Sequence, residues 1–261
     1  MKNGFTLVEL SIVLVILGLL VGGVLAGQSM IRASEIRRIS SEISTISTSM
    51  NAFRGKYLAL PGDMPNATQF WDIQAGTTGN DDTCYLSESN SPRTCNGNGD
   101  GYIFGGHTNT GHHERARAWQ HMANAGMISG SYTGVHGIYT AESRVGGRNA
   151  YLSSIDGTHY NLAYHSAGPA DPEFYPMQET HMIEHTVDFP VGTSPPRNVL
   201  WAEEAWNIDV KMDDGKPAIG SVRGPKMGGG WAPNCTTATD ATAEYALNSA
   251  GKNCYILAIL R

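Results

Sequence analysis

Hydrophobic positions divide the start of the chain into two successive patterns. From Phe5 to Gly27 almost every side chain is apolar, and Glu9 is the single ionisable group. At a rise of roughly 1.5 Å per residue, a helix of this length is about 35 Å long, enough to cross the hydrocarbon core of a bilayer. The pattern therefore predicts a membrane-spanning helix. A carboxylate inside such a helix is costly to bury, so Glu9 is a functional candidate that needs a cationic partner.

Beyond the apolar run, hydrophobic residues recur at alternating steps of three and four, which is the period of one helix face. They are Ile36, Ile39, Ile43, Ile46, Met50, Phe53 and Tyr57. We expect one helix from Phe5 to about Lys56, ending before Leu60-Pro61-Gly62. The stripe is compatible with a coiled-coil seam or with packing inside the chain. Two strict heptads are short for a coiled coil, so we favour packing inside the chain.

The remaining sequence predicts helices and strands in one mixed domain. Asp156-Gly157 is a strong two-residue hairpin signal between two alternating segments. Residues 61–110 are rich in turns. The expected helices are 114–125 and 202–211, and the expected strands are 150–155, 158–164, 219–223 and 255–260.

Length and composition limit the possible functions. With 261 residues, of which 41% are hydrophobic and 16% charged, the chain can form one sizeable globular domain behind its anchor. The net charge of −6 argues against a general nucleic-acid surface.

The cysteines form two pairs that are local in sequence, Cys84 with Cys95 and Cys235 with Cys254. Two disulfides in an oxidising compartment are the simplest interpretation. Free thiols or a four-cysteine zinc site are the alternatives, and the absence of C-x-x-C spacing disfavours zinc.

The cysteines indicate that the C-terminal part lies outside the cytoplasm, but the charges beside the apolar run favour the opposite orientation in the membrane. Arg32, Arg37 and Arg38 follow the run, whereas Lys2 alone precedes it. The positive-inside rule would place the C-terminal part in the cytoplasm. Large domains translocate largely regardless of flanking charge, so we follow the cysteines and expect an extracytoplasmic head.

The segment Gly4-Phe5-Thr6-Leu7-Val8-Glu9 resembles the processing site of type IV pilins and of the pseudopilins of type II secretion. The resemblance implies that a membrane peptidase cuts after Gly4 and N-methylates Phe5. It also implies a leader at 1–4, a long helix at 5–57 with a transmembrane and assembly segment at 5–27, and a head at 58–261. The implied fold class is α+β and type IV pilin-like, with the long N-terminal helix packed on an antiparallel β-sheet bearing disulfide-bounded loops.

The same resemblance implies a structural subunit rather than an enzyme. Cleavage would free an α-ammonium at Phe5, which could pair with Glu9 of a neighbouring subunit in a pilus-like or pseudopilus filament. The expected partners are other copies of this chain, other pilins or pseudopilins, the prepilin peptidase, the inner-membrane assembly platform and, before assembly, membrane lipid. The head is expected on the periplasmic side of the bacterial inner membrane before assembly. Major pilin, minor pilin and pseudopilin remain open.

Asn96-Gly-Asn98-Gly-Asp100-Gly101-Tyr102-Ile103 matches the first half of a calcium loop. Asn96, Asn98 and Asp100 would offer side-chain oxygens, and Tyr102 its carbonyl. His107 stands where a bidentate Glu is expected, so affinity would be modest unless Glu114 or another acid closes the shell. A set of Asx turns without an ion is the alternative.

Two weaker patterns complete the candidates. Asp209, Asp213 and Asp214 form an acidic turn that is a second possible calcium site, although Gly215 more simply ends a helix there. His181-Met-Ile-Glu184-His185 fits the H-x-x-E-H pattern of inverted zinc proteases, which requires a helix and a third ligand. A membrane-anchored monomeric periplasmic binding protein or zinc hydrolase is therefore the alternative function.

Overall fold

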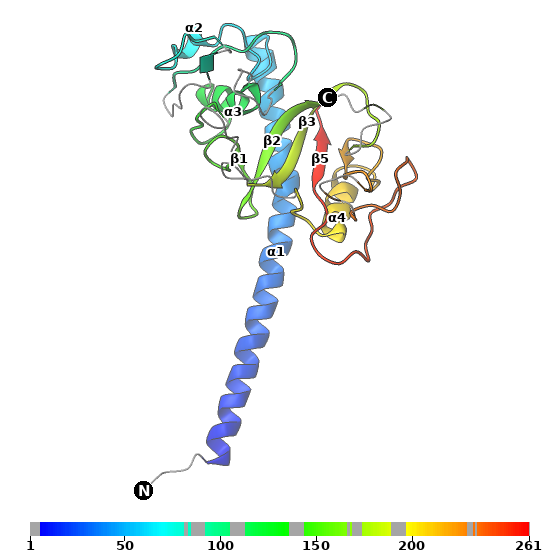
Figure 1. The fold of residues 1–261 in the computed structure, drawn as a ribbon. Helices are drawn as coiled ribbons and strands as arrows, with labels where there is room; N and C mark the ends of the chain where they lie inside the picture. The colour runs from blue at the N-terminus through cyan, green and yellow to red at the C-terminus, as the bar shows by residue number, and fades with distance from the viewer. Residues whose placement is uncertain are drawn as a thin grey trace.

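A single long helix carries a compact head at its upper end (Figure 1). The computed structural model describes residues 6–80, 83–84, 92–104, 113–135, 144–165, 168, 174–188, 197–228, 232 and 234–260. Helix α1 runs from Leu7 to Tyr57, with Thr6 as its N-cap and Leu58 in the left-handed conformation as its C-cap. The expected end of the helix is confirmed to within one residue. The expected start at Phe5 lies outside the described residues.

The upper half of α1 packs against the head, as the periodic stripe predicts. Its buried apolar residues are Ile39, Ile43, Ile46, Met50 and Phe53. Ile36 and Tyr57, at the two ends of the stripe, are partly buried against the same core. Packing inside the chain is therefore confirmed over the coiled-coil alternative.

The head contains a five-stranded sheet in the order β1-β2-β3-β5-β4, with every neighbouring pair antiparallel. The strands are β1 (Tyr151–Leu152), β2 (Thr158–His165), β3 (Thr180–Val187), β4 (Val222–Arg223) and β5 (Ile256–Ile259). Strand β5 lies between β3 and β4, so it pairs with two strands that precede it in the sequence. The expected α+β, type IV pilin-like fold is confirmed.

The hairpin signal at Asp156-Gly157 is correct, but the first strand is shorter than predicted. The Thr158 amide donates to the Ile155 carbonyl at 3.2 Å across these two residues. The β1–β2 ladder ends where Leu152 faces His159, which leaves 153–157 as the connection. Ser154 in this connection contacts α1 instead of continuing the ladder.

Among the residues that the structure describes, three helices accompany the sheet, and the sequence predicts two of them. Helix α3 spans Glu114–Asn124 and α4 spans Ala202–Met212, close to the expected ranges. Helix α2, Thr68–Trp71, is a single turn inside the turn-rich segment. Strand β3 was not predicted, because buried His, Glu and Thr side chains hide its alternation.

Both expected disulfides are present. Cys84 pairs with Cys95 at a Cα–Cα distance of 6.2 Å, and Cys235 pairs with Cys254 at 4.9 Å. Cys254 also forms an antiparallel bridge with Leu200, just before α4. The second disulfide thus ties the C-terminal loop to the segment that leads into α4.

Candidate functional site

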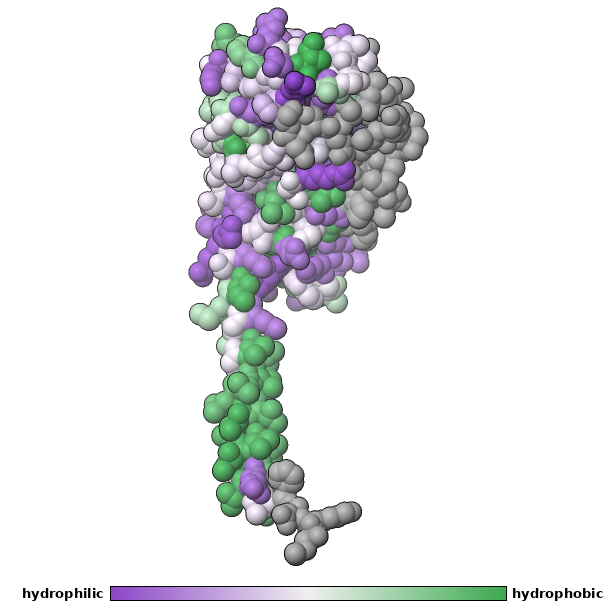
Figure 2. Space-filling view, turned by 90° about the vertical axis from the view of Figure 1, so that its left-hand side faces the viewer, coloured by the Kyte–Doolittle hydropathy of each residue, from purple (hydrophilic) through white to green (hydrophobic). Residues whose placement is uncertain are grey.

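The lower half of α1 projects from the head and is not covered by it. We call its apolar segment, residues 7–27, the rod. In its most apolar stretch none of the residues is buried, and Leu10 and Leu14 are 58% and 62% exposed. Figure 2 shows this rod as a continuous hydrophobic surface below a largely polar head. Among the described residues, α1 is the one helix long and apolar enough to cross a membrane. Such a surface needs lipid or other apolar helices around it.

Glu9 forms a reciprocal cap with Thr6 at the start of this rod. The Thr6 amide and hydroxyl each donate to Glu9 Oε2 at 2.8 Å, and the Glu9 amide donates to Thr6 Oγ1 at 3.2 Å. This capping box satisfies backbone donors that have no partner inside the helix. It holds the carboxylate at the end of the helix nearest Gly4 and Phe5, which themselves lie outside the described residues.

The junction between rod and head is held by ion pairs and hydrogen bonds. Arg32 Nε and Nη2 donate to the two carboxylate oxygens of Glu204 on α4 at 2.6 and 2.7 Å. About three turns further up α1, Glu42 Oε2 accepts from the Tyr160 hydroxyl at 2.8 Å and from the Ser154 amide at 3.2 Å. Burial and the adjacent Glu42 carboxylate raise the pKa of Tyr160 well above its ordinary value. These contacts fix the direction of α1 relative to the sheet.

Three carboxylates converge near the predicted calcium loop. One oxygen from each of Asp63, Asp100 and Glu114 lies within 4.8 Å of the others. Asp63 Oδ1 accepts from the Gly99 amide at 2.6 Å and Oδ2 from the Gly101 amide at 2.9 Å. Burial raises the pKa of Asp63, and these backbone donors act in the opposite direction. The group offers the oxygen ligands that calcium prefers, but backbone donors already occupy part of their capacity.

Only part of the predicted ligand set faces this group. Asp100 takes part in it, and Asn98 Nδ2 donates to Asp100 Oδ2 at 2.8 Å. The Asn96 side-chain oxygen instead accepts from the Thr68 amide at 2.9 Å. The Tyr102 amide donates to Asp100 Oδ1 at 2.9 Å, as in an Asx turn.

The sequence indicates Glu114 as a closing acid, whereas no pattern in it points to Asp63. Glu114 is the first residue of α3, and its Oε1 accepts from the Asn98 amide at 3.1 Å. Asp63 reaches the group because Gly62 before it adopts φ +88°, where an added Cβ would collide with the Glu114 carbonyl oxygen. The turn signal Leu60-Pro61-Gly62 was visible, but its distance from 96–103 in the sequence gave no sign of the contact.

The second acidic group, Asp209, Asp213 and Asp214, also comes together. Asp209 is buried, accepts from the Tyr245 hydroxyl at 2.9 Å and from the Gly215 amide at 3.0 Å, and has its pKa raised by burial to about 6. The Ser221 amide donates to Asp213 Oδ2. These bonds tie the end of α4 to the chain that follows, as expected for Gly215 ending the helix.

The H-x-x-E-H pattern lies in strand β3 and not in a helix. Side chains alternate along a strand, so His181 and His185 share one face and Glu184 points to the other. His181 Nε2 accepts from the Ile103 amide at 3.1 Å, whereas His185 Nε2 lies 3.0 Å from Ser153 Oγ. Glu184 Oε2 accepts from Asn161 at 2.7 Å. The helical arrangement of an inverted zinc protease is therefore not formed by these residues.

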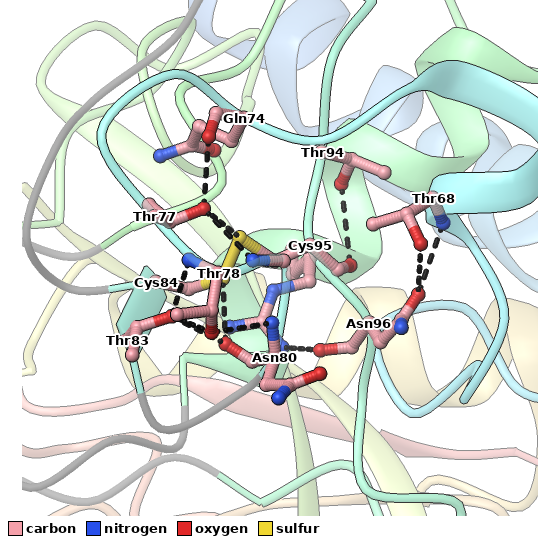
Figure 3. Close-up of a disulfide and its surroundings, with 12 residues drawn as sticks. Thr68, Gln74, Thr77, Thr78, Asn80, Thr83, Cys84, Thr94, Cys95 and Asn96 are labelled. Atoms are coloured by element: carbon pink, nitrogen blue, oxygen red, sulfur yellow. Dashed lines mark hydrogen bonds between the residues drawn. A yellow bond between two sulfur atoms is a disulfide. The ribbon is translucent and has the colours of Figure 1, made fainter.

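The first disulfide stabilises the upper loops of the head (Figure 3). The Thr77 hydroxyl donates to the Gln74 carbonyl at 2.8 Å and lies 3.5 Å from Cys95 Sγ. The Cys95 carbonyl in turn lies 3.1 Å from Nε2 of the buried His121 on α3. Burial lowers the pKa of His121 to about 3, so this imidazole is neutral and structural.

Comparison with known proteins identifies the N-terminal segment. Residues 1–25 match one protein-family profile, described as the prokaryotic N-terminal methylation motif. Neither a curated protein nor a solved structure shows significant similarity to the chain. The match covers the predicted cleavage site, the capping pair Thr6 and Glu9, and most of the apolar rod. The chain therefore carries the prepilin-type signal of type IV pilins and pseudopilins.

Proposed function

We propose that this chain is the precursor of a filament subunit, processed at Gly4-Phe5 and polymerised into a type IV pilus-like or type II secretion pseudopilus filament. The observation that supports this most strongly is the continuity of the methylation motif at 1–25 with an apolar rod that the head leaves uncovered. In the membrane, lipid surrounds the rod. In the filament, rods of neighbouring subunits replace the lipid.

The small residues of the rod suit such contacts. Gly18, Gly22, Gly23 and Gly27 lie on the rod, and a Cβ added at any of them would have no atom of the described head within 4 Å. Small residues spaced by four allow helices to approach closely in an apolar environment. These four positions therefore leave space in which a helix of another chain can approach closely.

We propose that Glu9 sets the register in which neighbouring subunits pack in the filament. Cleavage after Gly4 would place an ammonium group one residue from Thr6, the partner of Glu9 in the cap. An incoming subunit whose ammonium meets Glu9 leaves no unpaired charge in the apolar core, whereas a misplaced subunit leaves both charges unpaired.

The matched variants Glu9→Gln and Glu9→Ala test this role in cells that hold the assembly machinery. Glutamine keeps an oxygen for the Thr6 cap but lacks the charge, and alanine lacks both. We expect cleavage in both variants and a loss of most sheared or cross-linked filament in both. Glu203→Gln, an exposed acid on α4, serves as the control. Wild-type amounts of filament from Glu9→Gln would refute the charge-pairing role.

We also propose that the Asp63, Asp100 and Glu114 group binds calcium, with Asp63 in place of Asn96. The support is the convergence of three carboxylates within 4.8 Å. Calorimetric titration with calcium of the wild type and of Asp100→Asn tests it. We expect heat of binding in the wild type and weaker binding in the variant, while Asp213→Asn, in the other acidic group, leaves it unchanged. Equal binding by wild type and Asp100→Asn would contradict this assignment.

A further inference from the structure

We propose that the lower end of α4 docks the head onto the membrane surface before assembly, with Trp201 in the headgroup layer. The inference rests on the proposed membrane anchoring by α1. The occupant of this surface is the bilayer in which the rod is embedded. Trp201 lies close above the end of the apolar rod, α4 rises away from the membrane, and the indole ring is exposed.

The height follows from the pair between Arg32 and Glu204. Arg32 is five residues beyond Gly27, so it lies about 8 Å further along the axis of α1. Its guanidinium binds both carboxylate oxygens of Glu204 and donates to the Val199 carbonyl at 3.3 Å. The beginning of α4 is therefore held within about 8 Å of the level at which the apolar segment ends.

The direction of α4 follows from a second contact. Near the other end of α4, Lys211 Nζ donates to the Arg37 carbonyl at 3.4 Å. Because Glu204 contacts Arg32 and Lys211 contacts the higher Arg37, α4 ascends in the same sense as α1. Figure 1 shows α4 beside α1 at the lower edge of the head. Trp201 precedes Glu204 by three residues, which places it about 4 Å closer to the membrane.

The indole is exposed at this position although its neighbours are buried. Trp201 is 45% exposed, whereas Leu200 and Ala202 are 0% and 2% exposed. The Trp201 amide donates to Glu204 Oε2 at 3.0 Å, so the same carboxylate that binds Arg32 fixes the backbone of Trp201. Tryptophan favours the membrane–water interface because its ring is apolar and its N–H can reach polar groups.

The dimensions agree with an interfacial position. Headgroup layers are about 5–7 Å thick on each side of the hydrocarbon core. The Trp201 backbone lies about 4 Å beyond the level of Gly27, and its ring can extend several ångströms from there. Docking at Trp201 would hold the head against the membrane and orient the subunit for capture by a growing filament.

Fluorescence quenching by lipid tests the proposal on the full chain. The protein is reconstituted into phosphatidylcholine vesicles with or without acyl chains brominated near the headgroup, which quench tryptophan emission at short range. We expect brominated lipid to reduce the emission of the wild type. Trp201→Phe should lose most of this quenchable emission, and Trp71→Phe, at the distal end of the head, should retain it.

Flotation of the same vesicles distinguishes a failure of membrane anchoring by α1 from a failure of docking through Trp201. A chain that does not float with the vesicles overturns both the anchoring and the docking. A chain that floats, but whose quenching is equal in wild type and Trp201→Phe, overturns the docking alone. If Trp201 emission is insensitive to brominated lipid and shifts to shorter wavelength only in assembled filaments, a neighbouring subunit covers the ring, which also overturns the docking.

Discussion

Leu14 and Ile43 are both aliphatic residues of the same helix, yet Leu14 is 62% exposed and Ile43 is 3% exposed. Residues 7–27 of α1 are almost entirely apolar, and none of them is buried. The upper half is apolar on one stripe, and that stripe completes the core of the head. The two halves therefore depend on different surroundings. The upper half is stabilised by its own chain, whereas the lower half needs an apolar environment such as lipid.

The largest expected difference between the two halves of α1 is the change in the free energy of unfolding when a side chain is truncated. Phe53→Ala removes a fully buried ring and should reduce the free energy of unfolding of the head by about 3–5 kcal/mol. Leu14→Ala should leave it unchanged, because the head makes no use of that side chain. Denaturation in detergent, followed by near-ultraviolet circular dichroism, measures both. Equal destabilisation by the two variants would contradict the division of α1.

The disulfide beside α4 should have the next largest effect. Replacing both Cys235 and Cys254 with serine opens a link across 19 positions and should reduce the stability of the head by about 3 kcal/mol. The rod should remain helical, since neither cysteine belongs to it. Denaturation of the variant against the oxidised wild type measures the loss. An unchanged midpoint would show that the surrounding contacts hold the loop without the bond.

Acidification should destabilise the head and spare the rod. Burial lowers the pKa of His121 and of His185 to about 3 each, far below that of an unfolded histidine. The unfolded state then binds more protons, so stability falls as pH falls, by about 2 kcal/mol in sum between pH 8 and pH 6. The pKa of Asp209 is raised to about 6, so its protonation favours the folded state on acidification. This offsets a minor part of the stability lost through the two histidines.

Unfolding curves at pH 8, 7 and 6 measure this dependence. His185→Gln should lower the stability at pH 8 and make it less dependent on pH, because one buried imidazole is gone. A head that is equally stable at pH 8 and pH 6 would show that these histidines do not remain neutral in the folded state.

The smallest predicted effect concerns the contact between the two regions. Arg32 and Glu204 are partly buried, with side chains 26% and 16% exposed, so their pairing should stabilise the junction by about 1 kcal/mol. A double-mutant cycle with Arg32→Met and Glu204→Gln measures this coupling. Arg38 and Glu42, whose charges lie 3.8 Å apart with Arg38 68% exposed, should couple less and serve as the comparison. A stronger coupling for Arg38 and Glu42 would contradict this ranking.

The sequence predicts the rod and the stripe well because both follow from local periodicity. Ile39 through Phe53 are buried at the predicted positions, and the helix ends beside the predicted turn. The cysteine pairs are also local, with separations of 11 and 19 positions. These features depend on residues that are close together in the chain, so single-sequence patterns are sufficient.

Strand β3 and Asp63 were missed because their environment is set by distant segments. His185 and Glu184 are polar residues that become buried through contacts with Ser153, Asn161 and other residues far away in the sequence. Asp63 joins the acidic group through the amides of 99–101, more than 35 positions away. Periodicity carries no information about such partners.

Mass spectrometry of the N-terminal peptide, from protein isolated from its native envelope, tests the central claim most directly. The proposed function predicts a peptide that begins at N-methylated Phe5, since residues 1–25 match the methylation motif. A peptide that still carries Met1 to Gly4 would leave the Phe5 nitrogen as a peptide amide, with no ammonium group there to pair with Glu9, and would contradict the account.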